Sequence, residues 1–198
     1  MFILVIVPIG ITFYCFYSKT KGGLFFSLFL FSYLCGMNEH SVFLLLGANL
    51  GEREAMLAKA ARLIAERIGL IKAQSHLYET APWGMIDQPA FLNQVLEVKT
   101  ALLPEAVLVQ TLEMEKQLGR ERRMRWGARV IDIDMLYFAG VILETEALHL
   151  PHPRLHQRRF TLVPLAEIAP DFMHPVLHKT NQQLLCECTD DSQVSVCE

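Results

Sequence analysis

The sequence predicts an α+β fold in which two long helices cover an antiparallel sheet. Two segments repeat apolar residues at helical spacing. Short segments rich in apolar and β-branched residues are typical of strands and alternate with them. The resulting order, strand, helix, strand, strand, helix, strand, is the βαββαβ order of the ferredoxin-like fold. A chain of 198 residues fits one such domain with a small appendage.

The first half of the predicted core begins with a buried strand over Val42–Leu46, which ends at a glycine. The segment Gly47–Gly51 has the composition of a tight turn. A helix is expected over 52–68, because its apolar residues lie three and four apart and Gly69 follows it. The segment 71–78 is expected to form the second strand.

The second half of the predicted core follows a long irregular segment, Thr80–Pro89, which is interrupted by Pro and Gly. Loops of this length in a compact domain are often functional. A third strand is expected over 91–99. Pro104 suits the first position of a second helix over 105–118. The fourth strand, 130–138, is apolar and β-branched apart from two aspartates.

The C-terminal part of the chain contains weaker signals. The segment 141–150 is expected to be extended, 151–160 to be a basic loop rich in Pro, and 162–168 to be a short helix. The last residues, 181–198, are polar and are expected to form a disordered tail. We therefore expect the folded domain to span 37–180.

The N-terminal segment 1–36 is apolar and has only two charged residues, Lys19 and Lys21. Its first stretch, Met1–Tyr17, is at the lower limit of the about 17–25 residues that a membrane-spanning helix needs. No basic residue precedes this stretch, which disfavours a secretory signal. Three interpretations remain open: an anchor that leaves the domain on the cytoplasmic side, an interfacial segment, and translation that starts at Met37.

The overall charge and the cysteines limit the class of protein. A net charge of −3 gives no global basic signal for nucleic acid, so any phosphate binding must be local. The five cysteines form no C-x-x-C pair and no disulfide-like framework, which indicates a reducing compartment and a cytoplasmic domain.

Two aspartates and a cluster of arginines form the most informative pattern. Asp132 and Asp134 are two apart on a predicted strand, so they share a face at roughly 6–7 Å. Such a pair suits Mg²⁺, which takes one or two carboxylates together with substrate phosphates. Arginines, whose forked donors match phosphate oxygens, lie close by: Arg120, Arg122, Arg123, Arg125 and Arg129. A solvated strand face beside a charged loop is the simpler alternative.

The segment R-W-G-A-R-V-I-D-I-D-M-L, residues 125–136, resembles the signature of the 6-hydroxymethyl-7,8-dihydropterin pyrophosphokinase family. The turn at 47–51 resembles the family's G-S-N-L-G, with Ala48 in the Ser position. The likeness spans about 41–175. It implies a ferredoxin-like core, ATP as co-substrate, two Mg²⁺ ions and transfer of diphosphate to a reduced pterin in folate synthesis. We expect a monomer that binds no nucleic acid.

The resemblance also implies roles for individual residues. Asp132 and Asp134 match the metal ligands, and Arg120 and Arg129 match the residues that stabilise the transition state. The nucleotide would be bound by Arg122, Trp126, His152 and Arg158. The pterin would be bound by Thr80, Phe91, Asn93 and Phe160.

Several of these residues have simpler interpretations. On sequence alone, Phe91 and Phe160 are more typical of a core. Asn93 is also typical of a solvent-facing strand position, and Trp126 of a loop residue packed on the core. The chain also departs from the family pattern at Ala81, where Pro is common, and at Trp83, where an aliphatic residue is common. These departures affect the expected shape of the pterin pocket.

Other functions remain possible for this pattern. A transferase that uses a nucleotide-sugar also has a D-x-D site, and it would bind Mn²⁺ and a uridine nucleotide instead of ATP. An RNA-binding ferredoxin-like module would need exposed aromatics on its central strands. In the tail, His174, His178, Cys186 and Cys188 have the side chains of a zinc site, but Pro175 disfavours a helix that would join the two histidines.

Overall fold

The computed structural model of the chain describes residues 4–6, 12–14, 39–81, 88–120 and 130–197. The chain divides into two units, Met1–Met37 and Asn38–Glu198. In the first unit, β1 (Leu4–Ile6) pairs with β2 (Thr12–Tyr14) in antiparallel fashion. Within the described ranges, no helix has both the length and the apolar character needed to cross a membrane.

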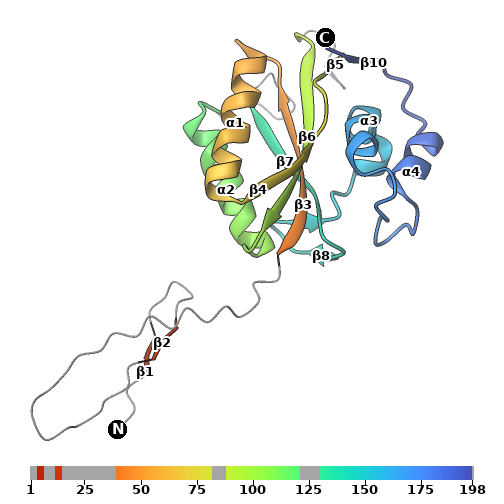
Figure 1. Cartoon of the computed structure of the whole chain (residues 1–198). Coiled ribbons are helices and arrows are strands. Elements are labelled where there is room, and N and C mark those ends of the chain that lie inside the picture. The colour runs from red at the N-terminus through yellow and green to blue at the C-terminus, as the bar shows by residue number, and fades with distance from the viewer. Residues whose placement is uncertain (1–3, 7–11, 15–38, 82–87, 121–129, 198) are drawn as a thin grey trace, which may run out of the picture. The chain divides into compact units, whose positions relative to one another are not determined.

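The second unit is built on a six-stranded antiparallel sheet (Figure 1). Five strands follow the order β10-β5-β6-β3-β7, and β4 pairs with β6 beside β5. The strands are β3 (His40–Ala48), β4 (Leu70–Gln74), β5 (Tyr78–Thr80), β6 (Phe91–Thr100), β7 (Asp132–Phe138) and β10 (Val194–Val196). The four-strand core β5-β6-β3-β7 has the ferredoxin-like arrangement, so the predicted fold class is confirmed.

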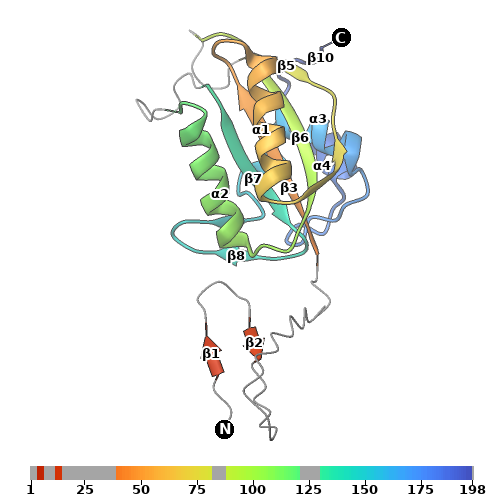
Figure 2. The same cartoon turned by 60° about the vertical axis from the view of Figure 1, so that its left-hand side comes forward.

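Helices α1 (Arg53–Arg67) and α2 (Pro104–Gln117) cover one face of this sheet, as Figures 1 and 2 show. Their apolar stripes bury Leu57, Ile64 and Met114 against sheet residues such as Leu44 and Leu96. Pro104 starts α2, as the sequence predicts, because proline needs no hydrogen-bond acceptor in the first turn.

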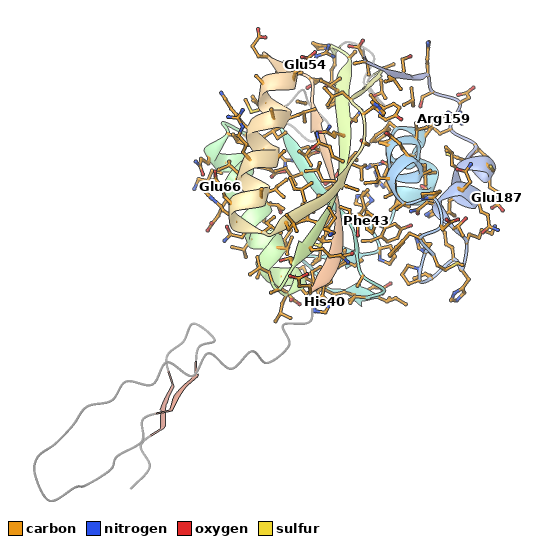
Figure 3. The ribbon with its side chains drawn as sticks, in the orientation of Figure 1. His40, Phe43, Glu54, Glu66, Arg159 and Glu187 are labelled. Carbon is orange, nitrogen blue, oxygen red and sulfur yellow. The ribbon has the colours of Figure 1, made fainter. Side chains whose placement is uncertain are left out.

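The other face of the sheet is partly covered by C-terminal helices. A short 3₁₀ helix (Leu155–Gln157) leads into α3 (Arg159–Ile168), and α4 (Asn181–Glu187) packs beside α3. A second core forms there, in which Phe43 lies between the sheet and α3 (Figure 3). A two-stranded ribbon of β8 (Leu143–Glu144) and β9 (His149–Leu150) connects β7 to this layer.

The segment expected to form one strand over 71–78 forms two strands instead. The chain leaves the ladder at Ser75, whose hydroxyl accepts a hydrogen bond from the N–H of Val95 and donates one to the carbonyl of His76. A serine side chain that bonds to backbone groups competes with the regular ladder in this way. Thr80, expected in the following loop, is thus the last residue of β5.

The prediction of a disordered C-terminal tail is wrong. Thr180 and Gln183 form a capping box at the start of α4, in which each side chain bonds to the other residue's backbone N–H. Leu184 is buried, and β10 adds a strand to the edge of the sheet at β5. Most polar residues of the tail face outward, but Asn181 is fully buried and accepts a hydrogen bond from the Tyr137 hydroxyl at 2.9 Å.

Candidate active site

The two aspartates of β7 lie on the sheet face opposite α1 and α2. Their neighbours Ile131, Ile133 and Met135 are buried in the core beneath those helices. Asp132 and Asp134 are both half-buried and point the other way, as alternation along a strand requires. In register, Asp132 pairs with Gly47 of β3.

Arg120 joins the acid pair to the helix layer. Its guanidinium donates to Asp132 Oδ1 at 2.7 Å and also to Glu115 Oε1. Burial lowers the pKa of Arg120, but the carboxylates of Asp132 and Glu115 raise it by more, so the side chain stays charged. Arg120, expected from sequence to act on phosphates, is therefore fixed beside the acid pair.

Glu115 is a site residue that sequence reasoning missed. It lies on α2, is 3% exposed, and accepts a hydrogen bond from the N–H of Ile133 at 2.8 Å. Burial raises the pKa of Glu115, while that N–H and Arg120 oppose the rise. The signal was available, because Glu115 falls on the buried stripe of α2 with Thr111 and Met114.

The candidate pterin residues meet on the same sheet face. Asn93 is buried and donates from Nδ2 to Thr80 Oγ1 at 2.8 Å. Its strand partner is Gly47, so Gly47 stands between Asn93 and Asp132 in adjacent strands. A Cβ placed on Gly47 would lie 3.1 Å from Asn93 Oδ1 and 4.0 Å from the ring of Phe91. The interpretation of Asn93 as a solvent-facing residue is therefore wrong.

The turn after β3 holds one end of the long loop. Asn49 is 2% exposed, and its Nδ2 donates to Gln88 Oε1 and to the carbonyl of Pro89, each at 3.3 Å. Arg53, at the start of α1, donates to Glu79 at 2.7 Å and to the carbonyl of Ala90 at 2.8 Å. These contacts fix the chain just before Phe91. The sequence predicts a turn here but indicates no role for either residue.

The C-terminal candidates lie around the start of α3. Burial, together with the charges of Arg158 and Arg154, lowers the pKa of His152 to about 4, so the ring is neutral at pH 7. Its Nδ1 accepts from the N–H of Arg154 at 3.2 Å, which places the ring proton on Nε2 as a donor. The guanidinium of Arg158 lies 5.6 Å from the ring centre of Phe160.

Phe160 is partly buried against the second core. This position is compatible with both interpretations of Phe160, as a wall of the pterin pocket and as a core residue. The predicted Arg122, Trp126 and Arg129 lie outside the described residues, as does Trp83.

In the tail, His174 Nδ1 accepts from the N–H groups of Val176 and Leu177. No group of three or more His, Cys, Asp or Glu side chains suited to a metal occurs in the described part of the chain.

The amino-acid sequence of the chain is similar to those of known proteins. The family model of 7,8-dihydro-6-hydroxymethylpterin-pyrophosphokinase matches residues 43–170. The chain belongs to this family. A 2-amino-4-hydroxy-6-hydroxymethyldihydropteridine pyrophosphokinase of Aquifex aeolicus is 40% identical over 149 residues, which are 75% of this chain and 92% of the relative. The protein of the same name from Methylorubrum extorquens is 47% identical over 129 residues, 65% of this chain and 82% of the relative.

Solved structures of the pyrophosphokinase family share the fold. The wild-type HPPK-DHPS protein of Plasmodium falciparum with pteroate superposes with a TM-score of 0.62 at 18% identity. An HPPK-DHPS structure in complex with substrates gives a TM-score of 0.63 at 15% identity. Both alignments cover 75% of this chain, which spans less than half of those longer proteins, 42% and 43%.

Membership in the pyrophosphokinase family establishes the activity. The chain is an ATP-dependent diphosphotransferase that transfers a pyrophosphoryl group to 6-hydroxymethyl-7,8-dihydropterin in folate synthesis. This confirms the activity that the sequence predicts and excludes the alternatives of a nucleotide-sugar transferase and an RNA-binding module.

Proposed function

We propose that the chain performs this transfer on the sheet face that carries Asp132, Asp134 and Asn93. The proposal rests on the register of β3 with its two neighbouring strands. In this register Gly47 pairs with Asp132 of β7 on one side and with Asn93 of β6 on the other. Adjacent strands are about 4.8 Å apart, so the two side chains start about 10 Å from each other. A phosphate chain and a pterin can lie side by side over Gly47, which has no side chain in the way.

Asp132 and Asp134 are the proposed ligands of two Mg²⁺ ions. The donor set fits, because both side chains offer carboxylate oxygens on one face, and Mg²⁺ completes its shell with water and substrate phosphates. When bound, the ions neutralise charge on the phosphates. Asp132 also holds Arg120 at the same place, where the guanidinium can donate to a phosphate oxygen.

The remaining nucleotide contacts are proposed for His152, Arg158, Arg122, Trp126 and Arg129. A neutral His152 with its proton on Nε2 is a donor without a formal charge, which suits a phosphate oxygen already facing several arginines. Arg129 and Arg120 are the proposed stabilisers of charge in the transition state. Trp126 is the proposed stacking partner of the nucleotide.

The pterin is proposed to lie between Phe91 and Phe160 and to bond to Asn93. Flat rings are held well between aromatic faces. The Asn93 amide is oriented by Thr80 Oγ1, which accepts one of its N–H groups. Its second N–H and its carbonyl oxygen then match a ring edge that both donates and accepts.

The transfer itself needs no nucleophile from the protein. The pterin hydroxyl oxygen attacks the β-phosphorus of ATP in line, and a new O–P bond forms. The bond between the β-phosphorus and the oxygen bridging to the α-phosphorus breaks, AMP leaves with that oxygen, and the hydroxyl proton is released. The residues named above act by positioning both substrates and by stabilising charge. We further propose that the chain acts as a monomer in the cytoplasm, where ATP is available.

Incubation of the full chain with ATP, Mg²⁺ and 6-hydroxymethyl-7,8-dihydropterin tests the proposal. We expect equal amounts of AMP and pterin diphosphate, and neither product when Mg²⁺ is removed with EDTA. Formation of ADP instead of AMP, or turnover that persists with EDTA, would contradict it.

A further inference from the structure

The N-cap residue of helix α3 and the residues of its first turn do not supply a side chain that caps its N-terminus. Its N-cap residue is Arg158, whose side chain makes no capping hydrogen bond, and its first turn contains no acidic residue. Helix N-termini leave backbone N–H groups without partners and carry partial positive charge. Two consecutive arginines, Arg158 and Arg159, are therefore placed at the helix end that disfavours cations.

A carboxylate from the C-terminal segment supplies the missing cap. Asp190 Oδ2 accepts a hydrogen bond from the backbone N–H of Arg159 at 2.8 Å, and Oδ1 accepts one from the N–H of Ser192 at 3.0 Å. Burial raises the pKa of Asp190, but these hydrogen bonds outweigh burial and hold the pKa below its ordinary value. Asp190 is thus charged at neutral pH and is 31 residues away in sequence from the N–H that it caps.

The same segment continues to the other side of the candidate pterin pocket. Val194 of β10 pairs with Thr80 of β5, and the N–H of Cys197 donates to the carbonyl of Leu77 at 2.8 Å. Figure 1 shows this segment running from α4 past α3 to β10 beside β5. Figure 3 places Arg159 at the end of α3 that the segment passes.

We propose that residues 190–197, the C-terminal strap, set the position of the pterin pocket walls, and that Asp190 is a positioning residue for pterin binding. One end of the strap fixes the start of α3, which carries Phe160, and the other fixes β5, which carries Thr80. The inference rests on the proposed pterin roles of Phe160 and Thr80. Asp190 itself contacts no substrate and acts through the backbone of Arg159.

The first test compares Asp190→Ala with Asp191→Ala. Both variants remove one negative charge, but Asp191 is exposed and makes none of the strap contacts. The dissociation constant of 6-hydroxymethyl-7,8-dihydropterin is measured with Mg²⁺ and a non-hydrolysable ATP analogue. We expect the dissociation constant to rise about fivefold for Asp190→Ala, which is the size that the usual stability loss of a missing helix cap has if it is expressed wholly in pterin binding. Asp191→Ala and Asp190→Asn, which retains an acceptor oxygen, should stay within about twofold of the parent.

A double-mutant cycle separates positioning from a general loss of stability. If Asp190 acts through Phe160, Asp190→Ala should not weaken pterin binding further once Phe160→Ala is present. The nucleotide dissociation constant should change little, because the ring of Phe160 follows the backbone more closely than the long side chain of Arg158 does. Equal, additive losses for pterin and nucleotide would overturn the inference.

A second variant covers the case in which Asp190→Ala does not fold. Arg159→Pro removes the same hydrogen bond from the donor side, and proline suits the first position of a helix. It is compared with Arg159→Ala, which keeps the N–H, and only Arg159→Pro should weaken pterin binding. If the parent binds pterin and these variants do not differ, the strap inference is wrong. If the parent forms no AMP from ATP and the pterin, the proposed function is wrong instead.

Discussion

Arg120 lies between a carboxylate of the helix layer and a carboxylate of the sheet. Glu115 fixes it from α2, and Asp132 fixes it from β7. Glu115 also accepts from the edge of β7 at the N–H of Ile133, so one buried side chain orients both the arginine and the strand that carries the acid pair. A buried ion pair is often no more stabilising than apolar residues of the same volume, so we infer that Glu115 is present for the site.

Glu115→Gln tests this role. Glutamine keeps an oxygen that can accept from Ile133 but loses the charge that holds Arg120. We expect kcat to fall about tenfold, which corresponds to losing about one charge-assisted hydrogen bond. The free energy of unfolding should fall by less than the about 3–5 kcal/mol that an uncompensated buried charge costs, because Arg120 keeps its ion pair with Asp132. Glu113→Gln, an exposed change on the same helix, is the control and should leave both quantities unchanged.

The two aspartates of β7 are expected to be essential for turnover but not for folding. Asp132→Asn and Asp134→Asn should each lower turnover by about 100-fold or more, because each removes a proposed metal ligand. Both side chains lie outside the apolar core, so the variants should still fold. Thermal unfolding measured with and without Mg²⁺–ATP checks the claim. The parent and Asp171→Asn, an exposed control, should be stabilised by Mg²⁺–ATP, and the two site variants should be stabilised less. Unfolding of the ligand-free site variants far below the parent would show that the aspartates are structural.

At the scale of elements, the close approach of β3 and β6 shapes the site. Gly47 is the point at which both Asp132 and Asn93 meet β3. Gly47→Ala would place a methyl group 3.1 Å from Asn93 Oδ1, so the amide must move by a few tenths of an ångström. Because Asn93 is buried and bonded to Thr80, this movement disturbs the proposed ring contacts.

We therefore expect Gly47→Ala to raise the KM for the pterin about tenfold, the cost of one impaired hydrogen bond in a buried site. Gly140→Ala is the matched control, since a Cβ there meets no atom within 4 Å. Steady-state kinetics with each substrate varied in turn measure the effect. An unchanged pterin KM in Gly47→Ala would place the pterin away from Asn93.

Much of the core was predictable because its periodicity is local. Helix α1 was expected over 52–68 and is found at Arg53–Arg67, and the aspartates of β7 point as alternation predicts. The C-terminal elements were not predictable in this way, because α4 and β10 are short and gain stability from tertiary contacts with α3 and β5. The capping of α3 by Asp190 likewise cannot be predicted from the local sequence, since the N–H that Asp190 caps is 31 residues away.

At the scale of the whole molecule, buried histidines make stability depend on pH. Burial is the main reason that the pKa of His174 is lowered to about 4, and the charges of the neighbouring His156 and His178 contribute to this shift. Its ring packs edge-on against Tyr137, so protonation would place a charge in the second core. Since the unfolded chain takes up the proton first, the free energy of unfolding is unaffected above pH 6.5 and falls as pH decreases from 6.5 to about 4.

His174→Asn should flatten this dependence. Asparagine can accept the N–H groups of Val176 and Leu177 in place of Nδ1, but it does not titrate. Between pH 6.5 and 4 we expect the variant to lose less stability than the parent, by at most about 3 kcal/mol. His149→Asn is the control and should follow the parent, because His149 is exposed and is not among the groups that shift the pKa of His174. Urea unfolding at a series of pH values measures the difference, and parallel curves for parent and His174→Asn would refute the assignment.

The division of the chain into two units gives the last prediction. The unit Asn38–Glu198 contains every proposed site residue, and the family match, residues 43–170, falls inside it. Its two cores are formed by residues from β3 onward. We therefore expect a chain that begins at Met37 to fold, and to match the full chain in kcat and in the KM of both substrates.

Thermal unfolding and steady-state kinetics of the two chains measure this, with a chain that begins at Leu46 as the control. That chain lacks most of β3, which pairs with both β6 and β7, so it should neither unfold cooperatively nor form AMP. Loss of folding or activity in the chain from Met37 would mean that residues 1–36 contribute to the enzyme itself. Membrane association that differs between two equally active chains would instead assign those residues a role in location, which is the anchor interpretation of the N-terminal segment.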